Sequence, residues 1–284
     1  MGNETRAVKS AGRDTPTAAP GAGAAPGRLS LLGLVYGIGT WLQFLLLGVL
    51  VVPVLLLTSR LSRRRALVRG LARLALRLAG MRLTVEGLDR LPQPCIVVAN
   101  HSSYLDGVVL CATLPVWFSF VIKREMAAVP LAGILLRRIG AEFVERGNRA
   151  RGVRDARRLL RQAAIGQALV FFPEGTFGID VGLRHFHIGA FAAAVRANLP
   201  VVPVAIRGTR HCLPPGNPWP RPGTIRIEAL AALPAPARGG MHNDRNPHDR
   251  EQGDREQALR LRDAARGALL AALGEPDLDK SARH

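Results

Sequence analysis

The sequence predicts an α/β protein with a mixed, largely parallel sheet flanked by helices, preceded by a hydrophobic membrane-anchoring helical segment. Three observations predict this class. Short β-branched runs alternate with helix-length segments from Arg82 onward. The chain has 284 residues and 48% hydrophobic content, which is enough for one sizeable core. Residues 29 to 59 contain no charged side chain.

The first 59 residues divide into two segments. Residues 1–28 are rich in Ala, Gly, Pro and Thr without periodicity, which predicts a disordered arm. The uncharged run that follows exceeds the ~20 residues of a simple membrane span, so we expect it to stay in the bilayer. Pro53 and glycines such as Gly37 and Gly48 allow either a tilted span or a re-entrant pair of shorter helices.

A basic helix is predicted directly after the anchor, and residues 29–80 form one anchoring region. Arg65, Arg69, Arg73 and Arg77 recur at four-residue intervals among Leu and Ala, which favours a helix lying on anionic headgroups. An ordinary solvated helix face is the alternative. Basic residues cluster on the carboxyl side of the anchor. The positive-inside rule therefore predicts that this side, and the domain beyond it, lie at the cytoplasmic face of the cell membrane.

The charge and the cysteines limit the classes of function. The formal net charge is +18, from 39 Lys and Arg against 21 Asp and Glu, which favours anionic membrane lipids and anionic substrates as partners. We expect no nucleic acid, because the chain lacks zinc-finger spacing and the aromatic-glycine motif of RNA binders. Cys95, Cys111 and Cys212 are isolated, so they predict neither disulfides nor a metal site.

The rest of the chain reads as alternating elements. Residues 81–233 are expected to form the catalytic domain, 234–254 a linker or loop, and 255–284 a C-terminal helix and tail. Strands are predicted at 82–87, 95–99, 117–122, 141–144, 168–172, 201–206 and 224–229, and helices at 104–113, 126–138, 149–165, 188–197 and 255–273.

The most informative segment runs from Ile96 to Asp106. An apolar strand ends in Asn-His-Ser-Ser, at the strand end where open α/β sheets place their chemistry. If His101 lies on the loop and Asp106 in the first helical turn, the carboxylate can hold one imidazole nitrogen while the other takes a proton from a hydroxyl. The alternative is a capping box, with Ser103 as N-cap and Asp106 bonded to its amide.

Three further segments also join a strand to polar or turn residues. Glu174, Gly175 and Thr176 follow the strand 168–172. Arg146 ends a short strand, and its guanidinium group is suited to binding a phosphate through two parallel hydrogen bonds. Pro203 interrupts an apolar strand, which predicts an edge strand or a bulge.

Together these motifs resemble the glycerolipid acyltransferase family, that of the lysophosphatidic acid acyltransferases. The resemblance rests on Asn-His101-x4-Asp106, Phe-Val-x-Arg146, Phe-Pro-Glu174-Gly-Thr and Val-Pro203-Val in this order, over about residues 82–230. It implies transfer of a fatty acyl chain from an acyl-CoA or acyl carrier protein thioester to the hydroxyl of a lysolipid such as 1-acyl-glycerol-3-phosphate, in phospholipid biosynthesis or remodelling, without a metal or another cofactor.

The resemblance also implies roles for individual residues. His101 would be the general base and Asp106 would orient it. Arg146, Glu174, Gly175 and Thr176 would contact the acceptor, and Pro203 would shape the acyl site. An activated thioester needs no covalent nucleophile, only a base and donors for the oxyanion, for which we expect amides from Ser102 to Tyr104.

Two departures and two rival functions remain open. Phe177 stands where many phosphate-acceptor members carry Arg, and His187 where Lys is common, so lysophospholipids and amino-acid lysolipids are also possible acceptors. His185 and His187 lack a third metal ligand nearby. A lipid hydrolase using Ser102 or Ser103 as nucleophile is the rival enzyme, although neither serine lies in a Gly-x-Ser-x-Gly elbow. A non-catalytic basic membrane-binding adaptor is the rival without chemistry.

Overall fold

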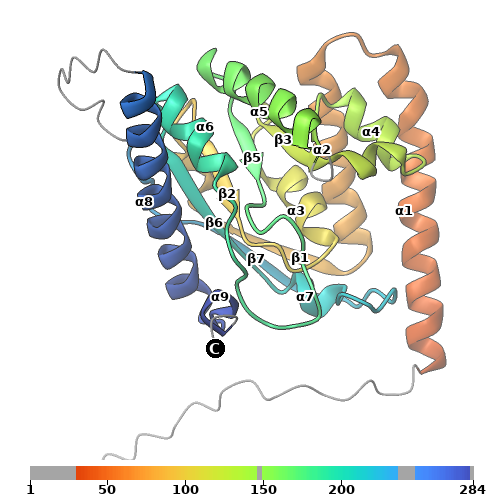
Figure 1. The fold of residues 1–284 in the computed structure, drawn as a ribbon. Helices are drawn as coiled ribbons and strands as arrows, with labels where there is room; N and C mark the ends of the chain where they lie inside the picture. Colours follow the sequence, from red (N-terminus) through yellow and green to blue (C-terminus); the bar gives the residue numbers. More distant parts are fainter. Residues whose placement is uncertain (1–29, 146–148, 236–246, 282–284) are drawn as a thin grey trace, which may run out of the picture.

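The computed structural model describes residues 30–145, 149–235 and 247–281, with a seven-stranded sheet at its centre (Figure 1). The strand order is β1-β7-β6-β2-β5-β3-β4, and all neighbours are parallel except β6 and β7. The mixed, largely parallel sheet is therefore confirmed. The strands are β1 (Met81–Glu86), β2 (Ile96–Ala99), β3 (Ser119–Lys123), β4 (Glu142–Val144), β5 (Leu169–Phe171), β6 (Val201–Arg207) and β7 (Gly223–Ala229).

Helices cover both faces of the sheet. α5, α6 and α8 lie on one face, α3 and α2 lie on the other, and α1 and α4 pack outside α2 (Figure 1). The helices are α1 (Leu31–Leu57), α2 (Leu61–Leu78), α3 (Leu105–Thr113), α4 (Ala132–Arg138), α5 (Arg149–Ala164), α6 (Gly189–Ala197), α7 (Thr209–Cys212), α8 (Pro247–Leu273) and α9 (Leu278–Ser281), with 3₁₀ helices η1 (Leu88–Arg90) and η2 (Arg124–Ala128).

Two helix predictions need correction. The helix expected at 126–138 is split into η2 and α4 around Pro130, because a proline disfavours helical backbone in the residue before it. The helix expected from 255 begins at Pro247, inside the segment 234–254 predicted as a linker or loop. Proline suits the first helical position, and the Glu, Arg and Gln residues that follow are good helix formers.

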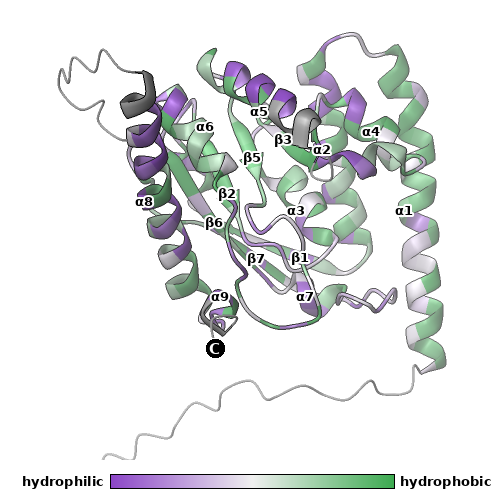
Figure 2. Ribbon diagram, in the orientation of Figure 1, coloured by the Kyte–Doolittle hydropathy of each residue, from purple (hydrophilic) through white to green (hydrophobic). Residues whose placement is uncertain are grey.

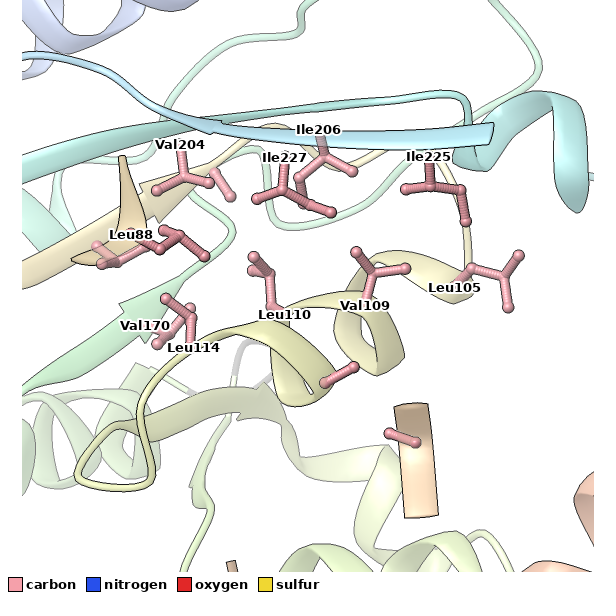
Figure 3. Close-up of a cluster of buried hydrophobic side chains, with 14 of the residues drawn as sticks. Leu88, Leu105, Val109, Leu110, Leu114, Val170, Val204, Ile206, Ile225 and Ile227 are labelled. Atoms are coloured by element: carbon pink, nitrogen blue, oxygen red, sulfur yellow. The ribbon is translucent and has the colours of Figure 1, made fainter. Parts of the chain in front are cut away.

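The hydrophobic core has one cluster on each face of the sheet. Alternate residues of β2 supply both, since Val97 and Ala99 join the cluster beneath α3 while Ile96 and Val98 join the cluster beneath α6 and α8. This burial on both faces explains why β2 reads as a continuous apolar run. Figure 3 shows the first cluster, with Val109 and Leu110 of α3 facing Ile206 of β6 and Ile227 of β7.

β6 is an interior strand, so an edge position for Pro203 is wrong, whereas the predicted bulge is consistent with the pairing. Val204 pairs with Ala229, and the next bridge joins Val201 to Leu233, so the partner side holds one extra residue. The carbonyl of Pro203 accepts from the amide of Leu230 at 2.9 Å within this irregular stretch. The missing proline N–H therefore falls where regular pairing with β7 has already ended.

The predicted anchor is a single continuous helix, α1, so the re-entrant pair is wrong. One stripe of α1 is buried, including Gly37, Gly48 and Leu55, and the other faces expose large apolar side chains. Figure 2 shows the hydrophobic colour along most of α1. Pro53 removes one backbone donor from the last turns of α1. Leu55 packs in a small cluster with Val68 of α2 and Ile139, and this packing keeps those turns helical.

Three of the four stripe arginines of α2 turn toward protein, which corrects the prediction that this stripe lies on headgroups. Arg73 donates to the carbonyl of Ala112 at 2.7 Å, and Arg69 donates to that of Thr113 at 3.1 Å. Arg65 donates to the carbonyl of Ile139 at 2.8 Å. These carbonyls include the unpaired ones at the end of α3, and guanidinium groups satisfy them.

Candidate active site

The chemistry-bearing residues meet at one edge of the sheet. β2 and β5 are parallel neighbours, so the residues that follow each strand emerge at the same edge. Asn100 fixes the end of β2, because its side chain accepts from the Ile206 amide at 2.7 Å and donates to the Ile206 carbonyl at 2.9 Å. The loop that carries His101 is thereby joined to β6.

His101 and Asp106 are in direct contact. Nδ1 of His101 lies 2.8 Å from Oδ2 of Asp106. The same Oδ2 accepts from the backbone amides of Ser102 at 2.6 Å and Ser103 at 2.8 Å, as expected of an ionised carboxylate. The proton of the neutral imidazole therefore resides on Nδ1, and Nε2 carries a lone pair. Nε2 has no hydrogen-bond partner among the described residues.

Asp106 fills the roles of base orienter and helix cap at once. It is fully buried at the first turn of α3, and the bond from the Ser103 amide is the return bond of the predicted capping box. Ser103 is not the N-cap, because α3 has Tyr104 at that position and Oγ of Ser103 accepts from the Leu105 amide. One carboxylate therefore both holds the imidazole and bonds the amide before the helix. One consequence contradicts our prediction for the oxyanion, because the amides of Ser102 and Ser103 are already bonded to Asp106. Of the three amides, that of Tyr104 alone lacks a partner among the described residues.

Glu174 is buried and joins two loops. Its Oε1 accepts from the amide of His101 at 2.7 Å, and its Oε2 accepts from the amide of Arg184 at 2.9 Å. Burial raises the pKa of Glu174 to about 7, against the lowering effect of these two backbone bonds and of His101. The turn that places it needs Gly175, whose φ of +75° favours glycine, and whose amide donates to the Phe172 carbonyl.

Aromatic side chains surround the imidazole. Phe172 stacks on His101 with ring centroids 4.2 Å apart, and Phe177 meets it edge-on at 4.5 Å. Phe177 also contacts Tyr104 at 4.8 Å. Phe172 and Phe177 therefore form an aromatic wall beside the imidazole. The sequence identified Phe177 only as a departure, and the wall depends on contacts about seventy residues apart, which no local pattern encodes.

The two serines are engaged elsewhere. Oγ of Ser102 lies 3.1 Å from Oγ1 of Thr209, and Oγ of Ser103 donates to the Leu213 carbonyl at 2.8 Å. Both serines are buried. Neither hydroxyl is bonded to His101 in the described structure, so the activated serine of a hydrolase is absent from these residues.

The remaining predicted residues are placed as follows. Thr176 is exposed next to Gly175, and Pro203 lies within β6, beside Val98 of β2. Arg146 lies outside the described residues, as do the predicted arm 1–28 and most of the loop before α8. Nδ1 of His185 lies 3.2 Å from Asp279, and the described residues contain no group of three potential metal ligands.

The chain is similar in sequence and in fold to known acyltransferases. Residues 82–207 match the family model described as Acyltransferase. The chain is 37% identical to a lyso-ornithine lipid O-acyltransferase of Pseudomonas aeruginosa, over 66% of this chain and 68% of that protein. The chain belongs to the glycerolipid acyltransferase family.

Other members of this family are also similar to the chain. It is 32% identical to a 1-acyl-sn-glycerol-3-phosphate acyltransferase of Chlamydomonas reinhardtii, over 54% of this chain. The match spans less than half of that protein's length, at 47%. The crystal structure of the 1-acyl-sn-glycerophosphate acyltransferase PlsC from Thermotoga maritima has the same fold, with a TM-score of 0.62 and 22% identity, over 81% of this chain and 97% of that one.

Proposed function

We propose that this acyltransferase moves a fatty acyl chain from an acyl thioester to the hydroxyl of a lysolipid, using His101 as the general base. The contact between His101 Nδ1 and Asp106 Oδ2 carries the proposal, since it leaves the lone pair of Nε2 available to accept a proton. The matched family and the names of its members support the same reaction class.

The proton and the acyl group move in opposite directions. Nε2 takes the proton of the acceptor hydroxyl as its oxygen attacks the thioester carbonyl. The carbon–sulfur bond of the tetrahedral intermediate then breaks, and the imidazolium returns the proton to the departing thiolate. Asp106 remains ionised throughout and balances the positive charge on His101. The amide of Tyr104, at the start of α3, is our candidate donor to the intermediate's oxyanion.

Glu174 has a positioning role in this proposal. Both carboxylate oxygens accept from backbone amides, so Glu174 fixes the loop of His101 against the loop of Arg184. Thr176 and Gly175 remain candidate acceptor contacts beside it, and Arg146 remains a candidate phosphate ligand. Pro203 is proposed to influence the acyl site through the irregular pairing of β6.

The proposal includes two classes of acceptor, which differ in their headgroup. A lysolipid such as 1-acyl-glycerol-3-phosphate is one candidate, and a lysolipid with an amino-acid headgroup is the other. The aromatic Phe177 against His101 and the similarity to a lyso-ornithine lipid acyltransferase favour including both headgroups in any assay. The donor is an acyl-CoA or an acyl carrier protein thioester.

We further propose that α1 lies within the cytoplasmic leaflet of the bilayer and does not cross it. Among the described residues, α1 is the one helix long and apolar enough to cross a membrane. It contacts the rest of the protein near both ends, since Gly37 lies against Trp219 and Leu55 packs with Ile139. These points are roughly 27 Å apart along the helix. A full crossing would draw Trp219 or Ile139 deep into the hydrocarbon, whereas an inclined position at the cytoplasmic face does not.

A direct assay tests this function. The purified full-length protein is incubated with a radiolabelled acyl-CoA or acyl carrier protein and with lysophosphatidic acid, lysophospholipids or lyso-ornithine lipid in turn. Formation of a labelled diacyl product with at least one acceptor is expected. Labelled free fatty acid alone, or an acyl-serine found by mass spectrometry, would favour a hydrolase. Vesicle binding without turnover would favour the adaptor.

A further inference from the structure

Exposed apolar side chains gather near His101. The loop Thr176–Gly182, here the 176–182 loop, carries Ile179 at 78% exposure and Val181 at 53%. Tyr104, at the start of α3, is 67% exposed and contacts the loop through Phe177, which also touches His101. Exposed side chains of this size beside a catalytic residue favour a contact with another surface.

This patch is connected to α1 through the segment that follows α7. Ile179 lies 3.9 Å from the Cβ position of Gly216, in the segment that leads to Trp219. The ring of Trp219 lies 2.7 Å from the Cβ position of Gly37, and Nε1 of Trp41 donates to the carbonyl of Pro218 at 2.6 Å. In Figure 1 the segment after α7 extends from the sheet toward α1. These contacts connect the 176–182 loop to the amino-terminal half of α1 through the segment 213–222.

Two backbone carbonyls of the 176–182 loop are bonded within the protein. Nη1 of Arg210 donates to the carbonyl of Gly178 at 2.9 Å and to that of Ile179 at 3.1 Å. An irregular backbone enters a lipid environment only when its polar groups are bonded within the protein. Arg210 supplies these bonds while the side chain of Ile179 stays exposed.

We infer that the 176–182 loop and Tyr104, both beside His101, form a second contact with the bilayer in addition to that of α1. The inference rests on the proposed function, which requires a lysolipid acceptor to reach His101. An aromatic ring with a hydroxyl, such as Tyr104, is typical of the membrane–water interface. Asp180 lies between Ile179 and Val181 in the loop, and its charge limits insertion to the interface.

A fluorescent probe tests the contact. Ile179→Cys and, as a matched control, Ile165→Cys are labelled with an environment-sensitive maleimide in the full-length protein. Ile165 is also 78% exposed, but it precedes β5 and so lies at the opposite edge of the sheet. Native thiols react slowly, because burial raises the pKa of Cys95 to about 12 and that of Cys111 to about 11, and also raises that of Cys212. Labelled wild-type protein supplies the background.

Vesicles of phosphatidylglycerol and phosphatidylethanolamine, with and without brominated acyl chains, are then added. We expect the probe at position 179 to brighten severalfold and to be quenched by brominated lipid, and the probe at position 165 to change little. Equal responses at the two positions on vesicle-bound protein would overturn the second contact and leave the proposed function intact. A protein that does not bind the vesicles would overturn the membrane location as well.

Kinetics gives an independent readout. In Ile179→Asp, the ratio of kcat/KM for a bilayer-embedded acceptor to that for a water-soluble short-chain acceptor should fall by about tenfold, because a charge replaces an inserted aliphatic side chain. Ile165→Asp should leave this ratio unchanged. An unchanged ratio in Ile179→Asp would contradict the inference, and absence of turnover with both acceptors in wild-type protein would contradict the proposed function instead.

Discussion

At the scale of single residues, the site depends on carboxylates that bond to backbone amides. Asp106 holds His101 together with the first turn of α3, and Glu174 holds the loop of His101 together with that of Arg184. Loss of either carboxylate therefore disturbs the position of the imidazole as well as its charge.

We expect His101→Ala to lower kcat by about 10²–10⁴-fold, the usual contribution of a positioned general base. Asp106→Asn should also be severely impaired, because an amide cannot balance the imidazolium and can favour the wrong tautomer. Steady-state kinetics with circular dichroism as the folding control provides the measurement. Near-normal turnover in folded His101→Ala protein would refute the mechanism.

The raised pKa of Glu174 gives a pH dependence with a definite sign. The pKa of this carboxyl is 4.5 in the unfolded chain and about 7 in the folded protein, so the folded protein binds the proton more tightly. The stability that the group contributes is therefore fully present below pH 4.5 and is lost as the pH rises to about 7. Glu174→Gln removes this titration. The wild type should therefore lose unfolding free energy relative to Glu174→Gln as the pH rises through this range. Urea denaturation at several pH values measures the difference, and a constant difference would contradict it.

At the scale of elements, α1 contacts the protein through glycines. A Cβ atom at Gly37 would lie 2.7 Å from the Trp219 ring, and one at Gly48 would lie 2.7 Å from the Leu131 side chain. Gly39, two residues from Gly37, has open space at the same position. The two neighbouring glycines therefore form a matched pair.

We expect Gly37→Leu to destabilise the docking of α1 by about 1–3 kcal/mol, because the new side chain must displace a packed indole ring. Gly39→Leu should be neutral or slightly stabilising, since leucine is the better helix former. Thermal unfolding in detergent, with protease access to the 213–222 segment as a second readout, checks the pair. Equal effects of the two substitutions would show that the contact between Gly37 and Trp219 does not contribute to the stability of the docked helix.

Prediction from sequence succeeded best for elements with strong local patterns. All seven strands were expected within a few residues, because short apolar runs between turn residues define them. Their order in the sheet was not predictable, since Asn100 meets Ile206 across 106 residues. For the same reason the dyad could be proposed from a spacing of five residues, whereas the aromatic wall and the roles of Glu174 required the folded chain.

At the scale of the whole molecule, membrane attachment should be apolar rather than ionic despite the charge of +18. α1 exposes many large apolar side chains, whereas Arg65, Arg69 and Arg73 donate to protein carbonyls. We expect the full-length protein to stay with membranes in high salt, which screens surface charges, and to be released by detergent. Fractionation by centrifugation tests this, and release by salt alone would contradict it.

The arginines of α2 have a further consequence during synthesis. The carbonyls that they bond lie 39 residues downstream for Arg73, 44 for Arg69 and 74 for Arg65, so α1 and α2 emerge from the ribosome before any of these acceptors does. Until then the nearest acceptors for three guanidinium groups beside a lipid-soluble helix are the phosphates of the headgroups. We expect a nascent chain stalled shortly after α2 to bind anionic vesicles in a salt-sensitive manner that the completed protein has lost. Folding of the domain would then exchange lipid phosphate for peptide carbonyl, one arginine at a time.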